Sequence, residues 1–265
     1  MGQGFKIDFL SNLSLKVNAH WLLDQGYYEA FNRDYLSRPG IWSTSRSSSA
    51  SYDKELSQTY NAVLNYDLTK GKHAGSALVG YEFYNKQWNG LSASGSGAPT
   101  DDFSDLALTS SEEGKRSIDT YHIEERIRSY FGRANYDYAE KYLVSGTFRY
   151  DGYSRLLGDN RWGFFPGVSA GWIVNKEDFM KKYNSLISFL KVRASYGLNG
   201  NVSGIGAYEL QGSYGSTKFN NQVGYAIGSI ANPGLKWERT KAAEAGIDIN
   251  FLENMINTNF PYYNR

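Results

Sequence analysis

Charged and aromatic side chains crowd the segment RYDGYSRLLGDNRWGFFPGVSAGW, residues 149–172. Its charged residues are Arg149, Asp151, Arg155, Asp159 and Arg161, and its aromatic residues are Tyr150, Tyr153, Trp162, Phe164, Phe165 and Trp172. These residue types could line a sugar-binding cleft or form a stacking surface for nucleic acid. They could equally form two strands of a wall with one apolar face and one wet face.

Other chemistry-bearing residues do not combine into a recognisable centre. The three histidines, His20, His73 and His122, are far apart and lack the spacing of metal ligands. The chain has no cysteine, and we find no carboxylate pair in an identifiable structural frame, which makes a glycan-active enzyme a weak hypothesis. A net charge of +1 gives no general attraction to nucleic acid. We therefore expect no enzyme, no metal, no cofactor and no nucleic-acid partner.

Composition indicates a β protein. The 265 residues include 22 Tyr, 14 Phe, 6 Trp and 28 Gly, but only 5 Pro. Aromatic residues favour strands, and glycine serves the turns between them. Mean hydropathy is −0.53, and no apolar run approaches the roughly 20 residues of a transmembrane helix.

Alternation of side chains predicts the strands. In KYLVSGTFRYD, residues 141–151, Tyr142, Val144, Phe148 and Tyr150 fall on one face, opposite a polar face of Ser145, Thr147, Arg149 and Asp151. The pattern recurs along the chain and predicts about nine antiparallel strands, joined in up-and-down order. We expect them to start near residues 4, 58, 73, 122, 141, 161, 188, 236 and 255.

Strand length and loop rhythm favour a membrane barrel. Several strands alternate for about 9 to 11 residues, enough to cross a bilayer when tilted. Short connections at 69–72, 139–140 and 252–254 alternate with longer ones at 22–57, 91–121, 152–160 and 198–235, and residues 175–187 suggest one or two helical turns. The fold class expected is all-β, with antiparallel strands forming part of a transmembrane β-barrel. A soluble carbohydrate-binding β-sandwich or adhesin is the alternative.

Within a barrel, the two faces assign candidate residues. Polar side chains expected to face the lumen, where they pair with one another or touch substrate or plug, are Arg133, Asp137, Arg149, Asp151, Arg193, Glu244 and Asp248. Aromatic side chains expected to face lipid are Tyr130, Tyr138, Tyr142, Phe148, Tyr150 and Trp162. Trp42, Tyr208 and Tyr214 lie in expected loops, where they could stack on sugar rings or simply pack the loops.

Several motifs in order carry a family resemblance. YFGRANYDYAEKYLVSGTFRYDGYSRL, NRWGFFPGVSAGW, NKEDFM, LKVRASYGLNGN and NPGLKWERTKAAEAGIDINFLENMI resemble the SusC/RagA-like branch of TonB-dependent outer-membrane transporters. The resemblance covers roughly residues 122–265, and HAGSALVGYEFYNKQ extends it upstream. It implies a barrel of about 22 strands with a plug. It also implies a Gram-negative outer membrane, a SusD-like surface lipoprotein partner, and import of oligosaccharides or peptides driven by the TonB complex.

The chain departs from that family in its extent. We identify no plug domain and no TonB box in the sequence. The sequence predicts about nine strands, whereas the family's barrel has about 22. We therefore expect residues 1–265 to be a partial barrel domain that reaches the TonB complex only through a plug outside this sequence. The alternation and the resemblance together predict that residues 149–172 are two barrel strands joined by an outer loop.

Overall fold

A computed structural model describes residues 2–183, 185–220 and 222–265. Its main feature is one ten-stranded sheet in the order β1-β2-β5-β6-β7-β8-β9-β10-β13-β14. The strands are β1 Gly2–Leu10, β2 Leu13–Asn32, β5 Ser47–Lys70, β6 His73–Ser96, β7 Arg116–Tyr138, β8 Tyr142–Tyr153, β9 Trp162–Ile173, β10 Ile187–Asn201, β13 Glu238–Phe251 and β14 Ile256–Asn264. Neighbours in the sheet follow chain order, and the paired strands from β7 to β14 are antiparallel, as expected.

Smaller elements fill the connections. Two hairpins, β3 Tyr35–Arg38 with β4 Ile41–Ser43 and β11 Ser213–Phe219 with β12 Gln222–Ser229, form separate two-stranded sheets. In the described ranges, four 3-10 helices complete the connections: η1 Leu106–Leu108, η2 Gly158–Arg161, η3 Val174–Lys176 and η4 Asp178–Tyr183. The helical turns expected at 175–187 are therefore present as η3 and η4. The described residues form one ten-stranded sheet and two two-stranded sheets, not two large sheets as in a sandwich, so the β-sandwich alternative is wrong.

Two expected loops were too long, and one strand was missed. The connection expected at 22–57 shrinks to 33–46, because β2 continues to Asn32 and β5 begins at Ser47. The connection expected at 91–121 shrinks to 97–115 for the same reason. A tight turn at 11–12 divides the N-terminal pattern into β1 and β2, which raises the strands of the main sheet from the expected nine to ten.

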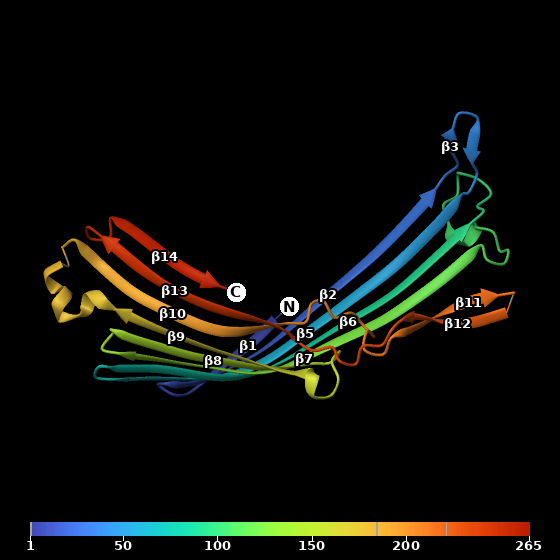
Figure 1. The fold of residues 1–265 in the computed structure, drawn as a ribbon. Helices are drawn as coiled ribbons and strands as arrows, with labels where there is room; N and C mark the ends of the chain where they lie inside the picture. The colour runs from blue at the N-terminus through green and yellow to red at the C-terminus, as the bar shows by residue number, and fades with distance from the viewer. Residues whose placement is uncertain (1, 184, 221) are drawn as a thin grey trace. The chain divides into compact units, whose positions relative to one another are not determined.

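The chain forms two compact units. The first unit contains His20–Gln58 and Asn85–Glu125, and the second contains Gly2–Ala19, Thr59–Tyr84 and Arg126–Arg265. Figure 1 shows β8, β9, β10, β13 and β14 of the second unit side by side in chain order.

In the first unit, Arg46 ties two connections together. Its guanidinium lies 2.7 Å from a carboxylate oxygen of Asp34 and 2.8 Å from one of Asp101. The hydrogen bond from Arg46 lowers the pKa of the Asp101 carboxyl. The backbone NH of Gly97 also donates to the carbonyl of Arg46, at 2.8 Å. The connections 33–46 and 97–115 are therefore joined by an ion pair and by a backbone hydrogen bond.

In the second unit, the buried core lies where two connections fold onto the sheet. Its buried members are Tyr153, Leu156, Phe165, Ile205, Leu210 and Trp237. The Trp237 ring meets the rings of Phe165 and Tyr153 edge-on, and its indole NH donates to the Arg161 carbonyl at 3.0 Å. Arg155 adds a hydrogen bond to the Ile205 carbonyl at 2.9 Å. The connections 154–161 and 202–237 thus share one small core.

The short turns bend through left-handed backbone. Ala139 and Glu140 have φ of 56° and 53°, which is the geometry of a two-residue type I′ turn. Residues other than glycine rarely adopt this conformation, and two hydrogen bonds hold the turn in place. The Glu140 NH donates to the Asp137 carboxylate at 2.7 Å, and the Ala139 NH donates to the Lys72 carbonyl at 2.6 Å. Asp137 is therefore a turn residue as well as a polar-face residue.

Replacing Trp237 by alanine should loosen both connections of this core. Removal of a buried tryptophan costs about 3–5 kcal/mol and leaves the Arg161 carbonyl without its donor. We expect faster cleavage by chymotrypsin within 154–161 and 202–212, mapped by mass spectrometry. Trp42→Ala is the matched control, because Trp42 is 63% exposed and its loss should leave those cleavage sites protected. Equal protection of both variants would show that Trp237 does not hold the connections.

Candidate functional site

The strand register of the second unit places many of its polar side chains on one face of the sheet. Asn135 pairs with Ser145, Ser145 with Ser169, Ser169 with Ser195, and Ser195 with Glu244. Residues directly opposite each other in antiparallel strands point to the same side, so this row crosses five strands on one face. The two-residue period then places every second residue of these strands on that same side, which we call the polar face.

Arg193 is the centre of a cross-strand charge cluster. It forms an ion pair with Glu244 and lies 3.4 Å from Asp248, both on β13. Asp248 also accepts a hydrogen bond of 2.7 Å from Asn259 on β14. Three of the residues expected on the lumen side are therefore brought together, in the kind of cross-strand ion pairing that the alternation suggested.

Arg149 forms a second cluster on the polar face. Its guanidinium makes two hydrogen bonds of 3.2 Å to Asp151, approaches Glu82 at 3.9 Å and lies over the Phe131 ring at 5.4 Å. Asp151 is buried directly opposite Ser129, whose equally buried hydroxyl has no hydrogen-bond partner among the described residues. The Arg149–Asp151 pair lies within one strand, so this cluster is not a cross-strand pair.

The remaining two expected lumen residues have other partners. Arg133 donates to the amide oxygen of Asn135 at 3.0 Å, and Asp137 caps the turn described above. All seven residues of the expected polar set lie on the polar face, by register and by these contacts. That this face looks into a lumen stays a prediction.

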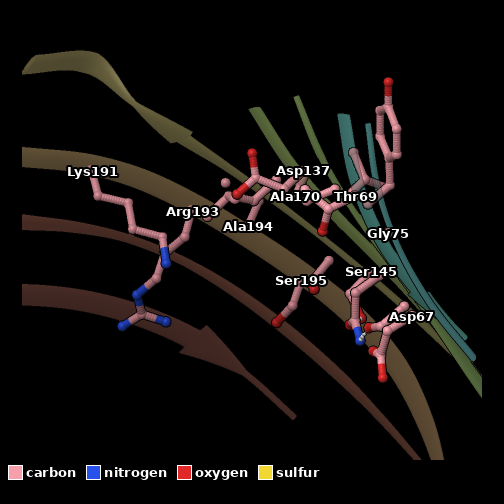
Figure 2. Close-up of a pocket in the computed structure, with 18 residues that line it drawn as sticks. Asp67, Thr69, Gly75, Asp137, Ser145, Ala170, Lys191, Arg193, Ala194 and Ser195 are labelled. Atoms are coloured by element: carbon pink, nitrogen blue, oxygen red, sulfur yellow. Dashed lines mark hydrogen bonds between the residues drawn. The ribbon is translucent and has the colours of Figure 1, made fainter. Parts of the chain in front are cut away.

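A groove of about 690 Å³ opens on the polar face toward the short-turn ends of the strands (Figure 2). Its polar lining residues come from β5, β6, β7, β8, β9 and β10, and they are Asp67, Thr69, Ser76, Asn135, Asp137, Ser145, Ser169, Lys191, Arg193 and Ser195. Asn135 links its neighbours by accepting from Ser145 at 2.7 Å and donating to Ser76 at 2.9 Å. Ser76, Asn135 and Ser145 are therefore held together by hydrogen bonds across three strands.

Sequence reasoning did not single out Lys191, Asp67, Glu82 or Trp237 as site residues. Lys191 and Asp67 occupy the same alternating positions as the chosen residues, so the period of two could have found them. Glu82 and Trp237 required the tertiary structure, because their partners Arg149 and Phe165 lie far along the chain.

The opposite face, which we call the aromatic face, carries the six aromatic residues that alternation assigned to the lipid side. Tyr150 stacks on Trp162 with ring centroids 4.8 Å apart, and Tyr81 meets Tyr130 at 5.2 Å. Tyr130, Tyr138, Tyr142, Phe148 and Tyr150 are all exposed, and Trp162 lies among them. The six residues expected to face lipid thus share one face, as alternation requires. That lipid covers this face stays a prediction.

Two of the three expected loop aromatics lie in strands. Trp42 is in β4 and Tyr214 is in β11, so each sits on a short hairpin rather than in irregular loop. Tyr208 lies in a turn with a φ of 67°. All three side chains are largely exposed, which leaves their predicted role in sugar stacking untested.

At the short-turn end, Glu177 collects three donors. Its carboxylate accepts from the Tyr142 hydroxyl at 2.7 Å, the Lys141 ammonium at 3.0 Å and the Trp172 indole NH at 3.2 Å. These donors, led by Tyr142, lower the pKa of Glu177 below its usual value of 4.5. The arrangement fixes the polar ends of two aromatic side chains at the edge of the aromatic face.

The described residues contain no group of histidine, cysteine or carboxylate side chains arranged to hold a metal ion. No described helix has the length and apolarity to cross a membrane.

The fold and its two faces define an antiparallel, up-and-down wall of the transmembrane-barrel class. The sequence profile described as TonB dependent receptor-like, beta-barrel matches residues 2–265. The chain therefore belongs to the TonB-dependent receptor β-barrel family, of the SusC/RagA-like type, whose members are outer-membrane proteins of Gram-negative bacteria.

Individual relatives agree with this assignment. TonB-dependent receptor P3 of Formosa agariphila is 35% identical over 214 residues, which cover 78% of this chain and 21% of that protein. TonB-dependent receptor SusC of Bacteroides thetaiotaomicron is 29% identical over 270 residues, covering 94% and 26%. A solved structure of the RagAB peptide transporter superposes with a TM-score of 0.88 at 21% identity, over 99% of this chain and 29% of that one. The chain thus spans only about a fifth to a quarter of these curated relatives.

The facing of β8 predicts opposite outcomes for two neighbouring arginine substitutions. Phe148→Arg would place a charge on the aromatic face, at a cost of about 2–4 kcal/mol if that face meets mid-bilayer lipid. Thr147→Arg would place the same charge on the polar face beside water. We expect Phe148→Arg to reduce the yield of heat-modifiable, folded barrel in outer-membrane fractions, and Thr147→Arg to retain it. The reverse order would mean that the polar face meets lipid and the aromatic face meets the lumen.

Acid should weaken the Glu177 cluster. Since the folded-state pKa of Glu177 is lowered, its stabilising effect is present above its unfolded pKa of about 4.5 and is lost as pH falls through the folded value. The thermal midpoint of the native protein should therefore exceed that of Glu177→Gln at pH 7, and the gap should close near pH 3. Asp159→Asn, at an exposed position, should follow the native profile. A gap independent of pH would contradict this reading.

Proposed function

We propose that the chain is part of an outer-membrane nutrient transporter that imports oligosaccharides or peptides, energised by the TonB complex. The observation that carries the proposal is the two-sided wall: aromatic side chains on one face and paired charges with hydroxyl groups on the other. Lipid accepts the first face and a water-filled lumen accepts the second. Relatives named as receptors and transporters support the same role, and we propose no catalysis.

The partners follow from the same proposal. The sheet ends in β1 and β14, each hydrogen-bonded to a neighbour on one side within the described residues. An unpaired edge cannot lie in hydrocarbon, so these edges are covered by further strands of the same barrel. We propose that residues 1–265 are a partial barrel domain, that a plug outside this sequence contacts the TonB complex, and that a SusD-like surface lipoprotein binds the complete transporter.

Energised uptake is the direct test. The complete transporter should be expressed in a Gram-negative host that lacks it, and uptake of fluorescent maltoheptaose and of a fluorescent tryptic peptide mixture should be followed. At least one cargo should enter, and its uptake should fall more than tenfold when TonB is deleted. A SusD-like lipoprotein should co-purify with the tagged transporter. Uptake that continues without TonB would indicate a passive channel instead.

A further inference from the structure

Two rows of aromatic rings cross the aromatic face of the second unit. The row toward the short turns consists of Tyr138, Tyr142 and Trp172, and the row toward the connection 154–161, which we call the outer row, consists of Tyr130, Tyr150 and Trp162. On both β7 and β8 the rows are eight positions apart. That is about 26 Å along the strand, or about 20 Å across a membrane at the roughly 40° tilt of barrel strands. The rows thus fit the aromatic girdles that border an apolar band about 25 Å tall, and a side chain just beyond the outer row reaches the lipid headgroups.

Arg128 is the first residue of β7 beyond the outer row on this face. It follows the two-residue period from Tyr130 and lies directly opposite Gly152 of β8. Its side chain is exposed, and its guanidinium lies over the Phe83 ring of β6, 5.9 Å from the ring centroid. Arg126, the next residue outward on the same face, is also exposed. The aromatic face therefore changes to positively charged side chains at the level where its outer row ends.

The charge of Arg128 is not matched by a carboxylate within the described part of the chain. Its partner there is the Phe83 ring, and no described acidic side chain forms an ion pair with it. Both strands that flank β7 in the sheet, β6 and β8, belong to this chain, and the residues that Arg128 meets on them, Phe83 and Gly152, are not acidic. A counter-charge for Arg128 must therefore come from outside the sheet.

Aromatic rings border Arg128 on two sides. Phe83 lies on the β6 side, and on the β8 side the Trp162 ring covers Gly152, where an added Cβ would come within 2.7 Å of the indole. The absence of a side chain at Gly152 is what lets Trp162 reach the backbone of β8 while it stacks on Tyr150. A guanidinium over an aromatic ring still presents its N–H groups at its edge, where they can donate two parallel hydrogen bonds to a phosphate.

Other partners fit this position less well. A neutral ligand would leave the guanidinium charge unmatched. An acidic protein segment would have to enter the headgroup layer beside the outer row. A phosphate at the surface of a bilayer already lies at this depth and carries the opposite charge, and arginine is the side chain best suited to bind it.

We propose that Arg128, with Arg126 beside it, binds the phosphate group of a lipid in the outer leaflet of the membrane. The acyl chains of that lipid lie along the aromatic face below the outer row, and the guanidinium of Arg128 holds its headgroup above Trp162. This lipid site is separate from the transport of cargo. It rests on the prediction that the aromatic face meets lipid and that the connection 154–161 lies outside the cell.

The test is a titration of the complete transporter, purified in dodecyl maltoside, followed by native mass spectrometry. The ligands are dioleoylphosphatidic acid, dioleoylglycerol, which has the same chains without the phosphate, and inorganic phosphate. Arg128→Gln should weaken binding of the first phosphatidic acid molecule about tenfold and leave dioleoylglycerol unchanged. Arg128→Lys should weaken it about threefold, because lysine keeps the charge but not the paired N–H groups. Arg133→Gln, at an exposed position on the polar face of the same strand, is the matched control without effect.

A photoreactive phosphatidic acid locates the bound lipid, and its cross-links should fall within residues 79–84 and 126–130. Equal losses of phosphatidic acid and dioleoylglycerol in Arg128→Gln would overturn the inference, because the arginine would then shape the site without contacting phosphate. Inorganic phosphate that binds as tightly as the lipid would make this a site for free anions. If TonB-dependent uptake is intact while phosphatidic acid binding ignores Arg128, only this inference is wrong; loss of uptake in the native transporter would bear on the proposed function alone.

Discussion

The two-residue period of the antiparallel ladder is the constraint from which the rest of the structure follows. Backbone hydrogen bonds are satisfied between strands, so the sheet can cross a medium that offers none. Each strand then presents alternate residues to two different surroundings. A shift of one residue in a single strand would exchange its two faces, which is why the register of Tyr130 with Tyr150 and of Arg133 with Thr147 matters more than any single contact.

Each face solves a different energetic problem. The aromatic face has large exposed side chains that stack in pairs and needs no complementary partner if fluid lipid covers it. On the polar face, charges either find counter-charges, as Arg193 does with Glu244, or remain apart across the groove. The same alternation that separates charged from aromatic side chains thus collects the charges on one face.

The buried apolar cluster of the second unit occupies a small part of that unit. Leu156 and Trp237 are buried where the connections 154–161 and 202–237 meet Phe165 of β9. In a wall with no interior of its own, such a core serves to hold the connections.

The amino-acid sequence by itself determined the β class, most strand positions from β6 to β14, the short turns and the division into two faces, because alternation is local and repeats along the chain. It also carried the family likeness. The turn at 11–12 was missed although Ser11 and Asn12 are turn-favouring residue types. The outer half of β2 was missed because Asp24, Gln25 and Gly26 interrupt its apolar alternation, and that of β5 because its serine-rich start at 47–51 looks like a loop. Only the tertiary structure decided that Asp248 pairs with Arg193 rather than Lys191, that Trp237 closes a core with Phe165, and that Asp67 and Lys191 line one groove. These are choices among partners distant in the chain, and they depend on register and side-chain reach rather than on local pattern.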